Sequence, residues 1–351
     1  MSAPAILIVG AGAVGQAYAL GLQRAGARVS FFVKPHHVDA LQKGIPVQEV
    51  GLLSVGPLED LSDVELLTDW SEVAERSFHS IWLAVDGTAL LGDWLEQMAA
   101  ARGRAAVVAF QAGVGGRKRL LSVIPDDELA MGMIPFLSWW APLDPDAELP
   151  AFDPPAPPRM RVWHPPLMRT PLSGAAGLVT DLVQLLRAGG LPATVVDNAA
   201  AAGSMGSAVL LPIIAGLELA GWSLKRFASG SEPALVMKAV QQARPIAAAS
   251  QGVQASRLVD ALLLRPALLR LGARVAPWFV PLDLETYLRV HFTKVGAQTA
   301  HTLRVLIDTA AERGMDAAAL STLSGQLDEL RARALEDGGQ SGESPMTSLE
   351  E

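Results

Sequence analysis

Short apolar runs alternate with amphipathic stretches in the first half of the chain. These runs do not alternate between apolar and polar residues as half-exposed strands do. Continuous apolar runs are typical of parallel strands buried on both faces. They cover residues 6–9, 29–33, 81–85 and 106–110. Apolar residues at helical spacing follow at 16–25, 90–101 and 117–123. The pattern predicts a doubly wound α/β sheet, with further strands at 129–133 and 193–196 and a helix at 173–188.

Two segments depart from this alternation. Residues 46–69 break at Gly51 and Gly56, which predicts two or three short strands or an excursion at the sheet edge. Residues 135–171 are rich in proline and tryptophan, which predicts two antiparallel strands joined by a stiff loop. We interpret this second segment as an insert in a first domain that covers residues 1–197.

The second half is almost wholly helical in pattern. Apolar residues recur at helical spacing over 198–222, 232–248, 256–276, 284–313 and 316–334. The run 209–220 is apolar, but Pro212 and Glu218 interrupt it, so we expect a buried core helix rather than a membrane span. These patterns predict an all-α domain over 198–337 and a polar, disordered tail over 338–351.

A glycine motif follows the first strand directly and opens the first helix. It reads Gly10-x-Gly12-x-x-Gly15, and a second predicted strand follows within about thirty residues. Such a turn presents backbone N–H groups at the positive end of a helix dipole, which binds a pyrophosphate. The motif predicts a Rossmann-type dinucleotide-binding domain. The expected cofactor contacts here are Gly10, Ala11, Gly12, Ala13, Val14 and Gly15.

The end of the second strand indicates which nicotinamide cofactor is bound. An acidic residue there binds the ribose 2′-hydroxyl of NAD, but in this chain none appears before Asp39. Lys34 stands where a cation would pair with a 2′-phosphate, with His36 or His37 beside it. The sequence therefore favours NADP(H) over NAD, although a solvated lysine at a strand end is also a common arrangement.

Composition narrows the class of protein further. The 351 residues carry a net charge of −8 without a basic cluster, which argues against a nucleic-acid partner. There is no cysteine, which excludes disulfides, thiolate catalysis and cysteine zinc sites and fits a cytoplasmic enzyme. His36 and His37 lack metal-ligand spacing, so we expect no metal.

Taken together, these features resemble the ketopantoate reductase family. A loop after a later strand reads Phe110-Gln111-Ala112-Gly113-Val114-Gly115, and a long apolar helix contains the run 205–212. The resemblance implies a helical domain like the C-terminal domain of 6-phosphogluconate dehydrogenase, NADPH between the domains, and hydride delivery to a 2-keto acid. Val85 and Gln111 are then expected at the cofactor. A small-molecule substrate is implied, no membrane partner is expected, and a homodimer is left open.

The working residues of that family do not carry over. Its loop asparagine, a substrate ligand, falls on Ala112, and its catalytic lysine falls between Gly203 and Met205, where no lysine stands. Its glutamate falls near Gln298, and a further lysine falls on Asp86. We therefore expect a divergent active site that acts on a carbonyl compound other than ketopantoate.

A polar stripe on one predicted helix offers replacements for these missing catalytic and substrate-binding residues. His291, Lys294, Gln298 and His301 fall along one face of the predicted helix 284–313. Lys294 is a candidate proton donor or carboxylate clamp, and either histidine is a candidate acid. A solvated face or a dimer contact explains the stripe equally well.

Other candidates for the substrate site are weaker. Trp139 and Trp140, with Trp163 and His164 on the partner strand, could form a cleft wall for an apolar substrate, although tryptophans are more often core residues. Ser204 and Ser207 lie near the missing lysine and could bind substrate, but small residues at a helix packing surface are the more common explanation.

Three functions remain open from the sequence. The leading hypothesis is an NADP(H)-dependent oxidoreductase that reduces a 2-keto acid or related ketone. The second is an enzyme of the same fold that isomerises or cyclises an apolar metabolite without redox chemistry. The third is a non-catalytic protein that binds a dinucleotide or a metabolite.

Overall fold

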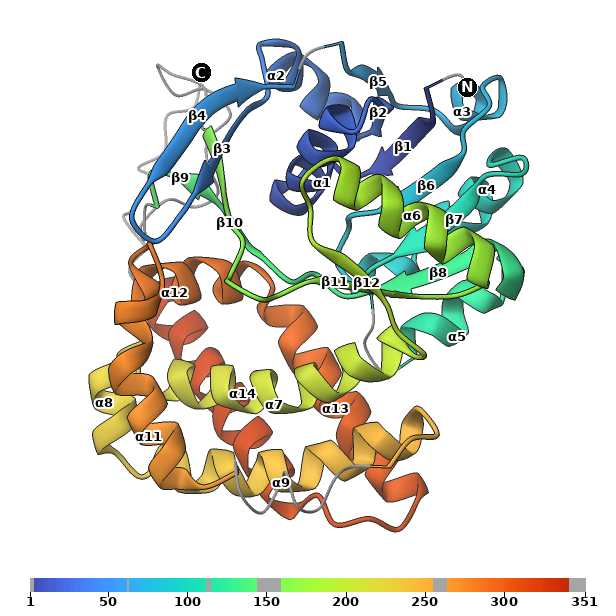
Figure 1. Cartoon of the computed structure of the whole chain (residues 1–351). Helices are drawn as coiled ribbons and strands as arrows, with labels where there is room; N and C mark the ends of the chain where they lie inside the picture. Colours follow the sequence, from blue (N-terminus) through green and yellow to red (C-terminus); the bar gives the residue numbers. More distant parts are fainter. Residues whose placement is uncertain (1–2, 62, 112–114, 144–158, 255–263, 341–351) are drawn as a thin grey trace, which may run out of the picture.

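The protein has an α/β part and a helical part, with the first helix of the helical part packed against both (Figure 1). The computed structural model describes residues 3–61, 63–111, 115–143, 159–254 and 264–340, with side chains to residue 334. The predicted α/β sheet domain followed by a helical domain is confirmed. The predicted tail covers 338–351: residues 338–340 belong to the last turn of α14, and 341–351 lie outside the described residues, as does part of the helix predicted at 256–276.

The main sheet has the order β12-β11-β8-β7-β6-β1-β2-β5. The strands from β8 to β5 in this order are parallel, whereas β11 pairs antiparallel with β8 and β12 runs parallel to β11. Their bounds are β1 (Ala5–Val9), β2 (Arg28–Phe32), β5 (Glu65–Leu67), β6 (Ser80–Leu83), β7 (Ala106–Ala109), β8 (Leu129–Gly132), β11 (Thr170–Ser173) and β12 (Ala193–Val195).

Helices cover both faces of this sheet because successive strand residues point to opposite sides. Ile6 and Ile8 pack with α1 (Ala13–Arg24) and α6 (Ala176–Ala188). Leu7 and Val9 pack on the other face with α3 (Trp70–Ala74), α4 (Trp94–Ala101) and α5 (Gly116–Leu121). Full burial of β1 on both faces explains why its sequence shows no alternation.

The short elements between these are α2 (Val38–Gln42) and the 3₁₀ turns η1 (Pro35–His37), η2 (Thr88–Leu91) and η3 (Asp126–Glu128).

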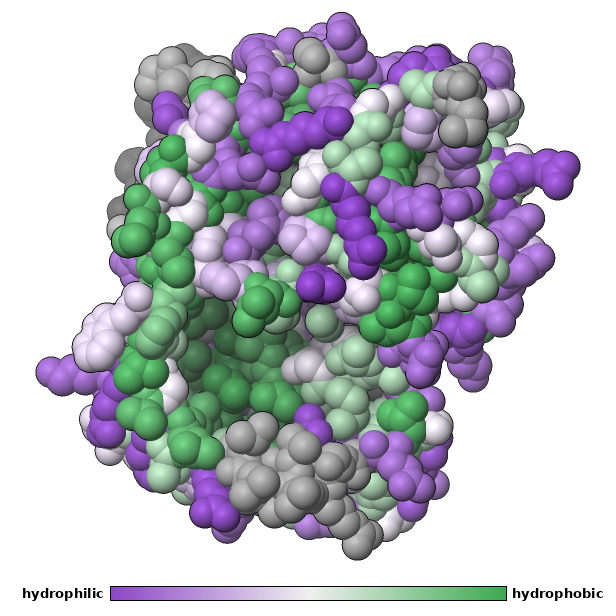
Figure 2. Space-filling view, in the orientation of Figure 1, coloured by the Kyte–Doolittle hydropathy of each residue, from purple (hydrophilic) through white to green (hydrophobic). Residues whose placement is uncertain are grey.

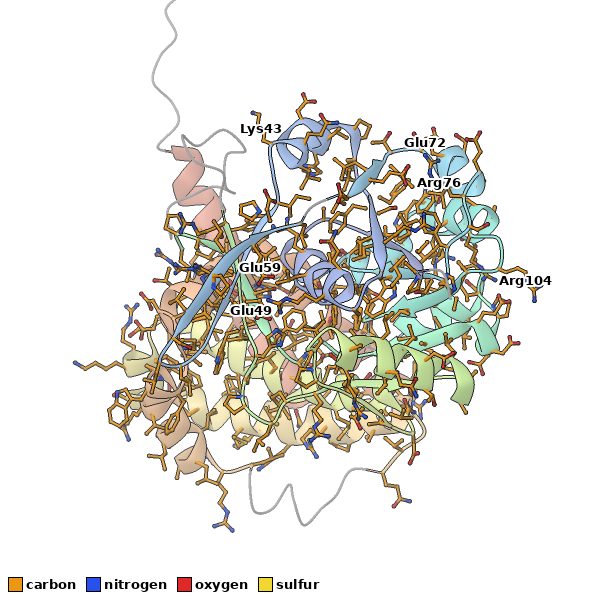
Figure 3. The ribbon with its side chains drawn as sticks, turned by 45° about the horizontal axis from the view of Figure 1, so that its top comes forward. Lys43, Glu49, Glu59, Glu72, Arg76 and Arg104 are labelled. Atoms are coloured by element: carbon orange, nitrogen blue, oxygen red, sulfur yellow. The ribbon has the colours of Figure 1, made fainter. Side chains whose placement is uncertain are left out.

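A second sheet joins the two unusual segments of the sequence. Its order is β4 (Val55–Asp60), β3 (Pro46–Val50), β10 (Arg159–Trp163) and β9 (Leu137–Ala141), with β3 parallel to β10 and β9 antiparallel to it. Figure 3 shows Glu49 and Glu59 on neighbouring strands of this sheet, beside α1. Arg24 of α1 forms ion pairs with both glutamates, which fixes the sheet against the helix. The two predicted antiparallel strands of residues 135–171 are thus confirmed as β9 and β10.

The helical part is built around α7 (Ala199–Leu219), which contacts α9 (Glu232–Ser250) most extensively. The α8 helix (Leu224–Ser229) was not predicted from the sequence. The remaining elements are α11 (Pro266–Val275), η4 (Ala276–Phe279), α12 (Leu284–Lys294), α13 (Gly296–Glu312) and α14 (Ala318–Gln340). By length and composition α7 could cross a membrane, but 56% of its apolar window is buried in the fold, which is the burial of a core helix.

The prediction of one continuous helix over 284–313 is wrong. The helix stops at Lys294, Val295 adopts φ −102° and ψ 21°, and a new helix starts at Gly296. Arg331 of α14 holds this break: its Nη1 donates to the Gly296 carbonyl at 3.1 Å, and its Nε and Nη2 donate to both carboxylate oxygens of Glu218 at 2.7 Å. The junction between α12 and α13 is therefore tied to α7 and α14.

Candidate functional site

The glycine turn lies at the carboxyl end of β1, with the geometry that a dinucleotide site requires. Gly10 adopts φ +99°, a left-handed conformation that favours glycine, and its N–H donates to the Phe32 carbonyl at 3.0 Å. A side chain on Gly15 would stand 2.1 Å from the Gly10 carbonyl oxygen. These two glycines therefore permit the turn and the close contact of α1 with β1.

Gly12 has a different role, because the space beside it is open. A Cβ atom on this residue would meet no described atom within 4 Å, and the residue is exposed at the N-cap of α1. Ala11, Ala13 and Val14 are half-buried against the core beside it. The side-chain amide of Gln16 donates to the Ala11 carbonyl at 2.9 Å and so braces the turn. Exposed N–H groups at the start of a helix with free space above them can hold a phosphate.

The ends of β6 and β7 complete one side of the site. Gln111 is buried and donates from Nε2 to the carbonyls of Leu83, at 3.0 Å, and Val85, at 2.6 Å. Among the described residues its Oε1 has no hydrogen-bond partner. The Val85 side chain lies 3.2 Å from the position of a Cβ on Gly10. Both predicted cofactor contacts thus stand beside the glycine turn, although Ala112 lies outside the described residues.

Basic side chains gather at the end of β2, on the other side of the turn. Lys34 and His36 are exposed, and the rings of His36 and His37 are 4.0 Å apart between centroids. Burial lowers the pKa of His37, and the charges of His36, Lys34 and Lys294 lower it further. Lys294 comes from α12, so a charge of the helical domain acts on this end of β2.

The predicted polar stripe is divided by the break between α12 and α13. Lys294 acts electrostatically on His37 at the end of β2. Gln298, on α13, places its Nε2 3.6 Å from the position of a Cβ on Gly87, in the loop after β6. His301 is exposed on the same helix. The stripe therefore faces the nucleotide domain at two separate points rather than forming one constellation.

His291 is packed into the protein. Its ring stacks on Tyr287 with centroids 5.4 Å apart and meets Phe292 edge-on at 4.9 Å. Burial, together with the nearby charge of Lys294, lowers the pKa of His291 to about 4. The imidazole is thus neutral near pH 7, which makes it a poor source of a proton for a carbonyl oxygen.

We predict that this histidine makes the fold sensitive to acid. The pKa of His291 falls from 6.5 in the unfolded chain to about 4 in the folded protein. Above pH 6.5 the imidazole is neutral in both states and the fold has its full stability. As the pH falls from 6.5 toward 4, the unfolded chain binds the proton more readily than the folded protein, and stability is lost. The loss attributable to His291 should be on the order of 2 kcal/mol. His291→Phe should therefore flatten urea-unfolding stability between pH 7 and 4 relative to the wild type. The exposed His301→Asn is the control and should keep the wild-type profile; identical profiles for all three proteins would contradict the prediction.

The predicted tryptophan wall is not formed by a pair. Trp139 is buried in a cluster with Tyr287 of α12, 6.3 Å between ring centroids, whereas Trp140 packs on the opposite side of β9 against the main core. Trp163 belongs to the cluster of Trp139, and His164 meets Phe136 edge-on. Trp139 and Trp163 thus pack the second sheet against α12, whereas Trp140 packs it against the main core.

The two serines differ in burial. Ser204 is buried, and its hydroxyl lies 3.1 Å from Nε2 of Gln251, next to the end of α9. Ser207 is half-buried on the next turn of α7. Ser204 therefore packs α7 against its neighbour.

Sequence reasoning missed an apolar face of α7. Ala202, Gly206 and Leu210 are exposed at i, i+4 spacing, and Leu210 keeps 45% of its surface accessible. The nearest described atom to a Cβ on Gly206 would be Sδ of Met133, 4.0 Å away and just past the end of β8. Figure 2 shows an apolar hollow at the level of α7. The spacing of small and apolar residues at 202, 206 and 210 was the signal that could have revealed it.

A second hollow, of about 1230 Å³, lies between α5 and the last turns of α9 and α13. Its lining carries charges of both signs, including Arg117, Asp127, Glu312 and Arg313. None of the predicted site residues lines it. Across the described ranges, no group of three His, Asp or Glu side chains is arranged to hold a metal ion.

Comparison with known proteins bears on this site. Residues 6–138 match the family model of ketopantoate reductase PanE/ApbA. No curated protein matches the chain in sequence.

Solved structures are similar along nearly the whole length. A PanE/ApbA family ketopantoate reductase from Ralstonia eutropha JMP134 has 20% identity and a TM-score of 0.68, covering 96% of this chain and 99% of its own. A D-mandelate dehydrogenase bound to NADH and anilino(oxo)acetate has 14% identity and a TM-score of 0.70, covering 93% and 97%. A dimeric ketopantoate reductase from Staphylococcus aureus has 14% identity and a TM-score of 0.63, covering 94% and 99%.

These similarities agree with the order of elements described above. The matched residues run from β1 to β9 and include the glycine turn, the β2 end and the loops after β6 and β7. The structural matches extend the agreement through the helical domain. Residues 6–138 thus match the ketopantoate reductase PanE/ApbA family model, and the chain as a whole has the fold of solved ketopantoate reductases.

Proposed function

We propose that the protein is an NADP(H)-dependent reductase of a 2-keto acid or related carbonyl compound other than ketopantoate. The observation that carries the proposal is the open turn at Gly12, the exposed N-cap of α1, where a Cβ atom would meet no described atom within 4 Å and no side chain caps the helix. The dinucleotide would supply the hydride. Lys34 and His36 at the end of β2, with no acidic residue before Asp39, favour the phosphorylated cofactor over NAD.

The apolar face of α7 supports a substrate with a sizeable apolar group. Parallel sheets bind ligands outside the carboxyl ends of their strands, and Gly206 faces the residue just beyond the end of β8. Leu210 exposes its side chain on the same face of α7, further along the helix than the place between Gly203 and Met205 where the catalytic lysine of the family falls. The D-mandelate dehydrogenase neighbour was solved with an anilino-substituted oxoacid, which is in keeping with an aromatic substituent.

Gln298 is the side chain of the polar stripe best placed for the carbonyl. Its amide lies beside Gly87 in the loop after β6, and β6 is a neighbour of β1 in the sheet. An amide N–H can donate to the carbonyl oxygen and to the alkoxide that forms from it, but it cannot release a proton. We therefore assign Gln298 to orient the carbonyl, and His301, exposed on the same helix, to supply the proton directly or through water.

The test uses the full-length protein and two measurements. Fluorescence titration with NADPH and NADH should show binding of both, with NADPH preferred. NADPH oxidation should then be followed with ketopantoate and with 2-keto acids bearing aromatic or branched side chains. Turnover should be highest for the apolar substrates. If neither nucleotide binds, the proposal is wrong; binding without turnover across the panel would favour a dinucleotide-binding protein, and turnover of a metabolite without nucleotide would favour non-redox chemistry.

We further propose a homodimer, because a neighbour of the same fold is described as dimeric. Exposed apolar side chains at the tip of the β3–β4 hairpin, among them Leu53 and Val55, are of the type found in subunit contacts. Light scattering coupled to size-exclusion chromatography should give a mass near twice that of the 36.9 kDa chain.

A further inference from the structure

Three aromatic side chains stack at the carboxyl end of the main sheet. Phe32 is the last residue of β2, Trp70 is the first residue of α3, and Trp94 is the first residue of α4. The rings of Phe32 and Trp70 lie 3.8 Å apart between centroids, with 16° between their planes. The rings of Trp70 and Trp94 lie 6.2 Å apart and are 11° from parallel. We call these three nearly parallel rings the aromatic column.

Hydrogen bonds fix both ends of the aromatic column beside the glycine turn. The Phe32 carbonyl accepts the N–H of Gly10 at 3.0 Å, so one end adjoins the turn directly. At the other end, Nε1 of Trp94 donates to the Ala89 carbonyl at 2.7 Å, in the 3₁₀ turn η2 that follows β6. Since β1 stands between β2 and β6, the column reaches from the end of one flanking strand to the loop after the other.

The aromatic column is only partly covered by protein. Its three rings are half-buried on the face of the sheet that α3 and α4 cover, where the two helices pack side by side (Figure 1). Trp82 of β6, in contrast, is fully buried, and its Nε1 donates to the Ser80 hydroxyl at 2.9 Å. The column therefore keeps aromatic surface accessible at the end of a parallel sheet, which is the end that binds ligands.

The end of β2 is also where a dinucleotide on the glycine turn places its adenosine ribose. The base attached to this ribose then lies next to the column, because Phe32 is the last residue of β2. Nucleic-acid bases stack on aromatic side chains, since every base has a flat π-face. We propose that the adenine of the cofactor stacks on the aromatic column, with the middle ring, Trp70, as its main contact. The assignment rests on the proposed function and names the residues that recognise the adenine half of the nucleotide.

The aromatic column is held in place before any nucleotide binds. The Asp69 carboxylate accepts the N–H of Ser71 at 2.8 Å, and the Glu72 carboxylate accepts the N–H of Asp69 at 3.1 Å. These two bonds form a capping box around Trp70 and fix the start of α3. The bond from Trp94 to η2 fixes the start of α4 in the same way. Rings that are already in position lose little conformational freedom when a base stacks on them.

The experiment compares three variants of the full-length protein. Trp70→Leu keeps the apolar bulk but removes the aromatic face, Trp70→Phe keeps a flat ring, and Trp278→Leu removes an exposed tryptophan of η4 in the helical domain. Affinities for NADPH, NADH and ADP, which carries the adenine without the nicotinamide, are measured by calorimetry. Trp70→Leu should weaken all three by about tenfold, as expected for the loss of one base stack, and Trp70→Phe by less than about threefold. Trp278→Leu should change none of them.

A second measurement needs no substitution in the column. ADP stacked on an indole should quench the tryptophan emission of the wild type, and Trp278→Leu should lose the same amount of emission when ADP binds. Binding of ADP to the wild type without any change in tryptophan emission would overturn the assignment, even if Trp70→Leu did not fold.

The outcomes separate this inference from the proposed function. If the wild type binds neither nucleotide, the reductase proposal fails with it. If the wild type binds NADPH but a folded Trp70→Leu keeps its affinity for ADP, only the adenine assignment is overturned. Equal losses in Trp70→Leu and Trp70→Phe would also overturn it, because the aromatic face would then not matter. With a working substrate, Trp70→Leu should raise KM for NADPH and leave kcat unchanged, because the hydride leaves from the other half of the cofactor.

Discussion

Gly15→Ala is expected to lower the free energy of unfolding by about 3 kcal/mol, the upper end of the usual range for overpacking. The added methyl group would stand 2.1 Å from the Gly10 carbonyl oxygen and 3.3 Å from Cγ2 of Ile8. The first of these atoms belongs to the backbone of the turn, so it cannot rotate away as a side chain would. Either α1 must move away from β1, or the turn must open. Urea unfolding followed by circular dichroism measures the loss.

The control is Gly177→Ala on α6. This helical glycine also lies in the α/β domain, but a Cβ atom there would meet no described atom within 4 Å. Alanine at such a position gains helix propensity and should raise stability by up to about 1 kcal/mol. If Gly15→Ala were as stable as Gly177→Ala, the close contact between α1 and the turn would not exist in solution.

The parts of this fold that the sequence predicted well are local. β1, the glycine turn and α1 follow one another within Ala5–Arg24, and each residue's neighbours along the chain decide its conformation. Gly10 and Gly15 take the roles that the motif assigns, because those roles concern backbone angles and contacts a few residues apart. The domain boundary at Asp197 also comes from a change of pattern along the chain and stays a prediction; α7 begins at Ala199.

Non-local pairings could not be read from the sequence. The pattern indicated strands in both 46–69 and 135–171, but their union into one sheet depends on the pairing of Val47 with Met160, more than one hundred residues apart. The break at Val295 was missed for a similar reason: the local spacing continues, and Arg331, from a later helix, binds the Gly296 carbonyl. A helical wheel drawn through such a break puts residues on one side of a single helix, although in the protein they point in different directions.

The candidate site shows the same division between local and distant information. Gln111 and Val85 were expected at the cofactor from the family resemblance, and they stand beside the turn. Lys294 and His291 were expected on one working face, but His291 is stacked on Tyr287 and Lys294 is exposed at the end of α12. Each residue of a helix is turned by about 100° from the one before it, so two side chains three residues apart lie close to the same face but not on one line. Only the surrounding packing decides which of the two side chains meets the cleft.

Gly12→Ala is expected to weaken NADPH and NADH binding by about 10- to 100-fold, equivalent to one or two hydrogen bonds to a charged phosphate. The fold should be unaffected, since Gly12 has φ −74° and ψ −176°, which alanine adopts readily, and its Cβ would meet no described atom. The methyl group would instead enter the space where the pyrophosphate must approach the N–H groups of α1. Fluorescence titration measures affinity, and thermal unfolding without nucleotide should match the wild type.

The comparison of Gly12→Ala with Gly15→Ala tests whether the turn is a binding site or only a packing device. A methyl group two residues after Gly10 should cost affinity and spare stability, whereas a methyl group five residues after it should cost stability first. Wild-type affinity in Gly12→Ala would mean that the dinucleotide lies away from the turn, and the reductase proposal would lose its main support. Loss of stability in Gly12→Ala would mean that protein atoms fill the space beside Gly12, which leaves no room for a phosphate there.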